Sequence, residues 1–192
     1  MGESAVWTVR EVAIVAFTLW VFVDVLVVFR RKTGTAQNRD RASLKLMMII
    51  GMISWPLAIL LAYLSFGRIH HTESIQYIGL IAFCMGVILR SLAIWQLGRF
   101  HTPNVAILDD HKLIENGIYR FVRHPSYLGA IIAFVGFGFA LGSWLSIVVV
   151  SAAAAISYLF RIHEEEAALG LALGEKYHAY CKRTKKLIPW VY

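Results

Sequence analysis

The sequence predicts an all-α, polytopic integral membrane protein, and three observations support this prediction. The chain has 192 residues, of which 58% are hydrophobic and only 16% are charged. Soluble domains typically have roughly 45–50% apolar and about 25% charged residues. The mean hydropathy is +0.62, and the apolar residues gather into five runs separated by polar segments. A soluble fold of this length could not bury so much apolar surface, so several segments are expected to face lipid.

The five runs predict five transmembrane helices, over residues 12–29, 44–66, 75–97, 127–141 and 145–160. The first three runs hold about 18–23 residues each, enough to cross a bilayer core at 1.5 Å per residue. The last two runs are shorter and are joined only by Gly142-Ser143-Trp144, which predicts a tight helical hairpin. A polar cytoplasmic loop over 98–123 and a C-terminal helix ending near Lys182 complete the expected fold.

The basic residues predict the orientation of the chain in the membrane. They cluster at 30–45, 99–123 and 161–186, and the positive-inside rule places all three clusters in the cytoplasm. We therefore expect an external N-terminus and a cytoplasmic C-terminus. The net charge of +7 then reflects topology rather than nucleic-acid binding, because no aromatic and basic residues interleave on one surface.

The domain organisation expected from this pattern is one membrane-embedded domain over residues 1–192. Residues 1–97 form a scaffold of three helices, and residues 98–192 carry the function. The two cysteines, Cys84 and Cys181, provide neither a disulfide framework nor a metal site.

A site is expected where the hairpin returns the chain to its starting side, so that Arg123-His124-Pro125 lies near residues 161–166. Pro125 suits the first position of a helix, where its missing N–H costs nothing. His124 can then present its imidazole to a ligand, and the free N–H groups of the helix start suit a carboxylate. On these residues alone, Arg123 and Tyr127 could equally mark the level of the lipid headgroups.

Arg161 and Glu165 form the second part of this expected site. They are four residues apart, so a continuous helix places them on one face. Arg161 offers a cation to an anionic substrate, and Glu165 offers a carboxylate to an amine or to sugar hydroxyls. Glu164 and Glu166 are expected only to favour the helix dipole and to be solvated.

Other polar and small residues within the apolar runs admit simpler interpretations. Asp24 and Arg90 are costly inside a membrane, which indicates a function or a buried partner, although Arg90 can also snorkel to the cytoplasmic side. Four glycines are expected to let the two hairpin helices approach closely, opposite Ala152–Ala155. They are Gly129, Gly136, Gly138 and Gly142.

Taken together, the motifs resemble the isoprenylcysteine carboxyl methyltransferase family, which is related to membrane phospholipid methyltransferases. The resemblance covers residues 90 to about 190 and indicates a compact, prokaryotic-type member. It rests on His111-Lys112-Leu113-Ile114, Gly117-Ile118-Tyr119, Arg123-His124-Pro125-Ser126-Tyr127-Leu128-Gly129, Arg161, Glu165-Glu166 and Gly174-Glu175-Lys176-Tyr177. On their own, segments 111–114 and 117–120 would rather indicate an interfacial loop, because motifs this short recur by chance.

The resemblance implies methyl transfer from S-adenosylmethionine to the carboxylate of a prenylated cysteine, forming a methyl ester at the cytosolic side of the membrane. Arg161 would contact the substrate, and Arg161 and Glu165 would be catalytic. The implied partners are a lipid-like prenylated acceptor and membrane lipids, with no metal and no nucleic acid. The cofactor would be held by Asn104, His111, Lys112, Leu113, Ile114, Tyr119, His124, Pro125, Ser126, Tyr127 and Glu165.

Two other functions stay open at this stage. The same fold could methylate the amine of an aminophospholipid headgroup, which would require a base such as Glu165 or His124. The chain could instead be a small membrane transporter or a non-catalytic scaffold. Transporters place ionisable residues near the midplane of the membrane, where only Asp24 and Arg90 qualify here.

Overall fold

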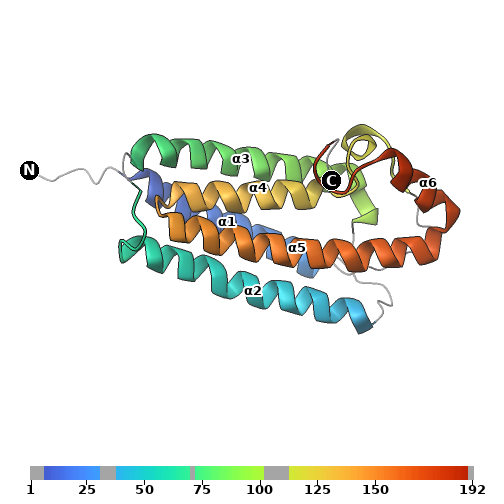
Figure 1. The fold of residues 1–192 in the computed structure, drawn as a ribbon, viewed down its shortest axis with the longest axis horizontal. Coiled ribbons are helices and arrows are strands. Elements are labelled where there is room, and N and C mark those ends of the chain that lie inside the picture. Colours follow the sequence, from blue (N-terminus) through green and yellow to red (C-terminus); the bar gives the residue numbers. More distant parts are fainter. Residues whose placement is uncertain (1–6, 31–37, 70–71, 102–112, 190–192) are drawn as a thin grey trace, which may run out of the picture.

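The computed structural model describes residues 7–30, 38–69, 72–101 and 113–189, and the described part of the chain is helical (Figure 1). A five-helix bundle occupies most of its length, and short 3₁₀ turns and a final helix gather at one end. The elements are α1 (Val9–Arg30), α2 (Asn38–Tyr63), α3 (Thr72–Leu97), η1 (Gly98–Phe100), η2 (Gly117–Arg120), α4 (Pro125–Ala140), α5 (Trp144–Leu173) and α6 (Glu175–Arg183).

The bundle has the lengths and the surface of a membrane protein. Among the described residues, three helical stretches are long and apolar enough to cross a membrane: Ser43–Tyr63, Glu73–Leu97 and Trp144–Leu173. Helix α4, with 16 residues, is a shorter apolar helix. Large apolar side chains such as Met52 and Trp95 are 74% and 81% exposed. Such outward-facing apolar residues are expected where the solvent is lipid.

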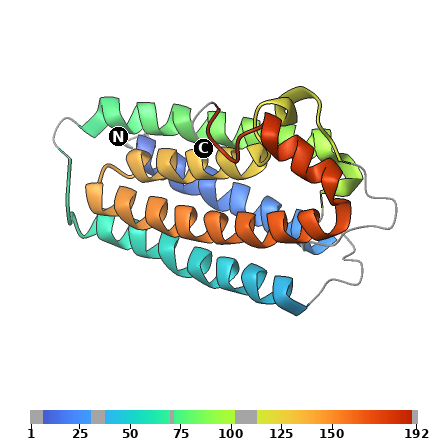
Figure 2. The ribbon, with the colours of Figure 1, turned by 45° about the vertical axis from the view of Figure 1, so that its right-hand side comes forward.

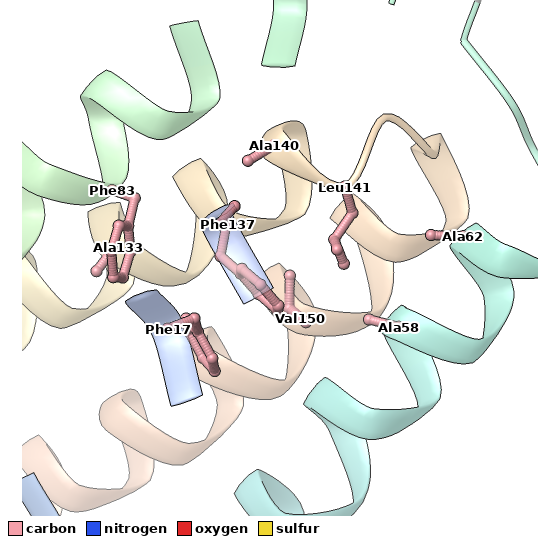
Figure 3. Packing of buried hydrophobic residues seen from close by; sticks show 10 residues of the cluster. Phe17, Ala58, Ala62, Phe83, Ala133, Phe137, Ala140, Leu141 and Val150 are labelled. Carbon is pink, nitrogen blue, oxygen red and sulfur yellow. The ribbon is translucent and has the colours of Figure 1, made fainter. Parts of the chain in front are cut away.

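Helices α3 and α4 lie side by side on one side of the bundle and α2 lies beside α5 on the other, as Figures 1 and 2 show. Helix α1 packs against α3 and α4 through Phe17, whose ring stacks on Phe137 at 3.8 Å and meets Phe134 edge-on at 5.2 Å. Figure 3 shows Phe17 and Phe137 at the centre of this core, with Ala133 beside them. Small alanines between the rings allow the helices to stay close.

The glycines of α4 correct one expectation from the sequence. A Cβ on Gly129 or Gly136 would collide with the backbone of α3, at Arg90 and Phe83, and not with α5. Gly79 and Gly86 of α3 meet the α4 backbone in the same way. Only Gly138 faces α5, at Ile147. The glycines therefore allow α3 and α4 to pack closely, because small residues on both helices bring the two backbones into contact.

Backbone contacts define the two ends of the bundle. At one end, Leu141–Ser143 link α4 to α5, and the Ser143 hydroxyl donates a 2.7 Å hydrogen bond to the carbonyl of Phe66, just after α2. The N–H of Trp144 donates to the carbonyl of Gly67 at 2.9 Å. The starts of α2 and α4 and the polar extension of α5 consequently lie at the opposite end, together with α6 (Figure 1).

Candidate active site

The start of α4 is built as the sequence predicts. Pro125 is its first residue and His124 is the N-cap, so the proline ring occupies a position that needs no N–H donor. His124 is only 4% exposed, and its ring stacks on that of Tyr127 with centroids 5.6 Å apart. Ser126 is buried beside it. The imidazole is therefore fixed in place at the helix start.

Helix α5 continues well beyond its apolar part and carries the second half of the site. The Tyr127 hydroxyl donates a short 2.6 Å hydrogen bond to Oε2 of Glu165. This bond confirms that the start of α4 and the polar end of α5 meet, as the returning chain predicts. The Glu165 side chain keeps 26% of its surface exposed, so it can still bind a ligand.

Glu166 differs from its expected role as a solvated helix-start residue. Its side chain is only 16% exposed, and its Oε1 lies 2.7 Å from Nε of Arg123 and 3.3 Å from Nε2 of His124. Lys186 approaches its other oxygen at 3.2 Å. Glu166 is thus the anionic centre of a cluster of cations, because Arg123 and Lys186 both face it.

The C-terminal segment after α6 completes this cluster. The N–H groups of Arg123 and His124 donate to the carbonyls of Lys185 and Lys186 at 2.8 and 3.0 Å. The Arg123 guanidinium also donates to the carbonyls of Thr184 at 2.5 Å and Cys181 at 3.3 Å. A cavity of about 300 Å³ lies here, lined by Arg123 and residues 181–186. The tail therefore fixes the segment that leads into α4, a role that no sequence motif signalled.

Arg161, the expected substrate-binding cation, forms a hydrogen bond with α2. Its Nη1 donates a 2.8 Å hydrogen bond to the hydroxyl of Ser43, and the residue is 3% exposed. It lies on α5 one helical turn before Glu165, close enough to the Tyr127 hydroxyl for the two to interact. Ser43 was missed in the sequence because a lone serine near the start of an apolar run carries no recognisable signal.

Tyr119 and the segment before it cover the end of α3. The Tyr119 hydroxyl donates to the carbonyl of Ala93 at 3.2 Å, and the Tyr180 hydroxyl donates to the carbonyl of Tyr119 at 2.7 Å. Burial raises the pKa of the Tyr119 hydroxyl well above its ordinary value, so this hydroxyl stays protonated. Leu113 and Ile114 are half-buried just before η2.

Three of the expected cofactor-binding residues cannot be placed. Asn104, His111 and Lys112 lie outside the described residues.

Asp24 and Arg90, the two ionisable residues within apolar runs, are partners of one another. Arg90 Nε and Nη2 lie 2.9 and 2.8 Å from the two carboxylate oxygens of Asp24. The expectation that Arg90 snorkels toward the cytoplasm is therefore wrong, because its guanidinium forms a two-pronged ion pair inside the bundle. The expectation of a buried partner is confirmed.

Sequence comparison finds a family that part of this chain resembles. Residues 78–170 match the family model described as the isoprenylcysteine carboxyl methyltransferase family. A probable protein-S-isoprenylcysteine O-methyltransferase of Oryza sativa subsp. indica is 34% identical over 119 residues, which cover 61% of this chain and 62% of the rice protein. The protein-S-isoprenylcysteine O-methyltransferase of Dictyostelium discoideum is 28% identical over 184 residues, covering 92% of this chain and 74% of that protein.

Structural comparison agrees with the sequence. A solved structure of the eukaryotic intramembrane Ras methyltransferase superposes with a TM-score of 0.62 at 26% identity, covering 75% of this chain and 52% of the other. The match spans about three fifths (62%) of the length of the rice relative. By fold and apolar surface the chain is an integral membrane protein, and over residues 78–170 its sequence is similar to the isoprenylcysteine carboxyl methyltransferase family.

Proposed function

We propose that the chain transfers the methyl group of S-adenosylmethionine to the carboxylate of an isoprenylcysteine-like amphiphile at the membrane–cytosol interface, forming a methyl ester. The observation that supports this most is the meeting of Arg161, Tyr127 and Glu165 at one end of the bundle. These three residues lie within the part of the chain that matches the family. They combine a buried cation with a partly exposed carboxylate, as a reaction between a cationic donor and an anionic acceptor requires.

The residues around Glu165 are chemically suited to S-adenosylmethionine. Glu165 remains 26% exposed and can accept hydrogen bonds from an amine or from ribose hydroxyls. The Tyr127 ring can stack on a nucleoside, and we propose that the apolar side chains of Leu113 and Ile114, just before η2, contact it as well. We propose that the following residues also bind the cofactor: Asn104, His111, Lys112, Tyr119, His124, Pro125 and Ser126. When bound, the cofactor supplies a methyl group activated by a sulfonium.

Methyl transfer to a carboxylate asks the protein mainly to position the reactants and to exclude water. Arg161 would orient the acceptor carboxylate, because a guanidinium forms two parallel hydrogen bonds to a carboxylate. The Tyr127 hydroxyl holds the Glu165 carboxylate in one orientation. The acceptor is already ionised at neutral pH, so no general base is needed.

The contacts of the two candidate bases favour a carboxylate over an amine as the acceptor. Methylation of a lipid amine requires a group that removes a proton before attack. Glu165 already accepts from Tyr127 at 2.6 Å, and His124 lies 3.3 Å from Glu166 and is 4% exposed. Both residues are better placed to hold a ligand than to shuttle a proton to bulk water.

The proposal includes an arrangement in the membrane. Helices α1 to α5 cross the bilayer, with α4 and α5 as a hairpin, an external N-terminus and the site on the cytoplasmic side, where the basic residues of the tail lie. The whole chain then forms one domain. Its first three helices supply part of the site, because Ser43 and Asp24 contact Arg161 and Arg90.

The proposal is tested with purified protein in detergent, radiolabelled S-adenosylmethionine and N-acetyl-S-farnesylcysteine. We expect label that is released by mild base, as a carboxyl methyl ester requires, and loss of that label in Arg161→Ala and Glu165→Ala. Arg183→Gln, which changes an exposed arginine, should retain full labelling. Base-stable label on aminophospholipids would instead establish N-methylation, and absence of cofactor binding would refute a methyltransferase altogether.

A further inference from the structure

The ion pair between the buried Arg90 and the partly exposed Asp24 lies next to the first turn of α4. Arg90 is 6% exposed in α3, and both prongs of its guanidinium contact Asp24 of α1, at 2.9 and 2.8 Å. Ionised side chains are costly inside a membrane protein. The pair joins α1 to α3. The family match starts at residue 78, so it covers most of α3 and none of α1.

A third contact extends the pair to the start of α4. Nη1 of Arg90 donates to the carbonyl of Ser126 at 3.4 Å, in the first turn of that helix. Gly129 makes this possible, because a Cβ there would lie 2.6 Å from the Arg90 backbone nitrogen. The close approach of α3 and α4 lets one guanidinium contact α1 and the first turn of α4 at once.

We infer that Arg90, held by Asp24, is a positioning residue that sets the place of the first turn of α4 and thereby the affinity for S-adenosylmethionine. The inference rests on the proposed function. Ser126 is followed directly by Tyr127, whose hydroxyl holds Glu165 at 2.6 Å, and His124 caps the same turn. A small displacement of this turn moves all these ligand-facing groups together, and sub-ångström placement governs binding and catalysis.

The decisive variant is Arg90→Lys, assayed with radiolabelled S-adenosylmethionine on the full-length protein in detergent. Lysine keeps the positive charge and one contact to Asp24, but it lacks the planar fork that contacts Asp24 and the Ser126 carbonyl together. We expect the Kd for S-adenosylmethionine to rise about tenfold. The matched control is Phe17→Leu, which loosens the packing of α1 on α4 about two helical turns before Asp24. It should lower Tm at least as much and leave Kd unchanged.

A charge-swapped protein, with Asp24→Arg and Arg90→Asp combined, separates positioning from folding. The swap restores an ion pair between α1 and α3, but an aspartate at position 90 has no N–H to donate to Ser126. We expect Tm to recover relative to Arg90→Ala while Kd stays raised. If the swapped protein does not fold, the comparison of Arg90→Lys with Phe17→Leu decides alone.

The outcomes distinguish this inference from the proposed function. An unchanged Kd in Arg90→Lys, or full recovery of Kd in the swapped protein, would show that the pair only stabilises the bundle and would overturn the inference. If the unaltered protein itself does not bind S-adenosylmethionine, the proposed function fails instead.

Discussion

The guanidinium of Arg161 donates a 2.8 Å hydrogen bond to the hydroxyl of Ser43, which lies 118 residues earlier in the chain. Both residues are buried, at 3% and 2% exposure. The bond ties the start of α2 to the polar extension of α5. Helix α2 therefore contributes to the candidate site through its packing on α5 and through this polar contact.

Replacing Ser43 by alanine is expected to impair binding of the acceptor and spare binding of the cofactor. A hydrogen bond to a charged group contributes about 1.5–3 kcal/mol, so the KM for N-acetyl-S-farnesylcysteine should rise roughly tenfold or more. Steady-state kinetics at saturating S-adenosylmethionine measure this. The control is Ser54→Ala, whose hydroxyl donates to the carbonyl of Gly51 in its own helix at 3.3 Å. Equal effects of the two variants would contradict a specific role for Ser43.

Neutralising Glu165 should weaken cofactor binding, whereas neutralising its neighbour should not. Glu165→Gln keeps the shape of the side chain but replaces a charged acceptor of the Tyr127 bond and of the proposed ligand contacts. Charge-assisted hydrogen bonds are roughly twice as strong as neutral ones, so we expect an increase in Kd of about tenfold. Isothermal titration with S-adenosylmethionine measures it. Glu164→Gln is the control, and a comparable loss there would mean that general negative charge matters, rather than Glu165.

Removing the charge of Glu166 should destabilise the tail and the start of α4. Glu166 is 16% exposed and faces Arg123 at 2.7 Å and Lys186 at 3.2 Å. Leaving a half-buried cation without its partner costs about 1–3 kcal/mol, so Glu166→Gln should lower Tm by several degrees. The control is Arg183→Gln. It breaks the exposed pair with Glu115, where the side chains are 64% and 37% exposed, and should cost less than about 1 kcal/mol. Thermal unfolding in detergent compares them.

Backbone packing predicts opposite effects for two helical glycines. A methyl group on Gly136 would collide with the backbone of Phe83, whereas nothing lies within 4 Å of a methyl group on Gly51. Gly136→Ala should therefore destabilise by about 1–3 kcal/mol through overpacking. Gly51→Ala should be neutral or stabilising by up to about 1 kcal/mol, because alanine favours the helix. Tm values in one detergent test this, and a loss in Gly51→Ala would show that α2 packs against something else.

Much of the fold could be predicted from the sequence, because apolar runs and the residues that end them are local signals. Pro125 starts α4 as its missing N–H predicts, and Gly142, with a φ of 71°, makes the tight turn before α5. The meeting of Arg123 and Tyr127 with the polar end of α5 also followed, because a returning chain leaves few other places for them.

The predictions that were wrong concern which helix each side chain faces, which the sequence alone does not determine. Gly129 and Gly136 could serve either α3 or α5, and only the assembled bundle shows that they pack on α3. The sequence predicts that Glu166 is solvated, because nothing in it indicates that Lys186 and Arg123 reach Glu166 from elements far apart in the chain. Likewise Asp24 and Arg90, 66 residues apart, need the packing of α1 on α3 before they become a pair.

The pH dependence of the reaction should distinguish a carboxylate acceptor from an amine. A carboxyl group with an ordinary pKa near 3.5 is fully ionised above about pH 6, and the Arg161 guanidinium keeps its charge over the whole accessible range. The rate of ester formation should therefore be flat between about pH 6 and 9. An aminophospholipid must lose a proton first, so its methylation would accelerate steadily as the pH approaches the pKa of the amine. Initial rates of total radiolabel transferred to each acceptor at saturating substrates measure the profile, and Arg161→Lys tests the orienting cation by lowering the plateau without adding a slope. A plateau supports the carboxylate, and a tenfold rise per pH unit would point to deprotonation of the acceptor.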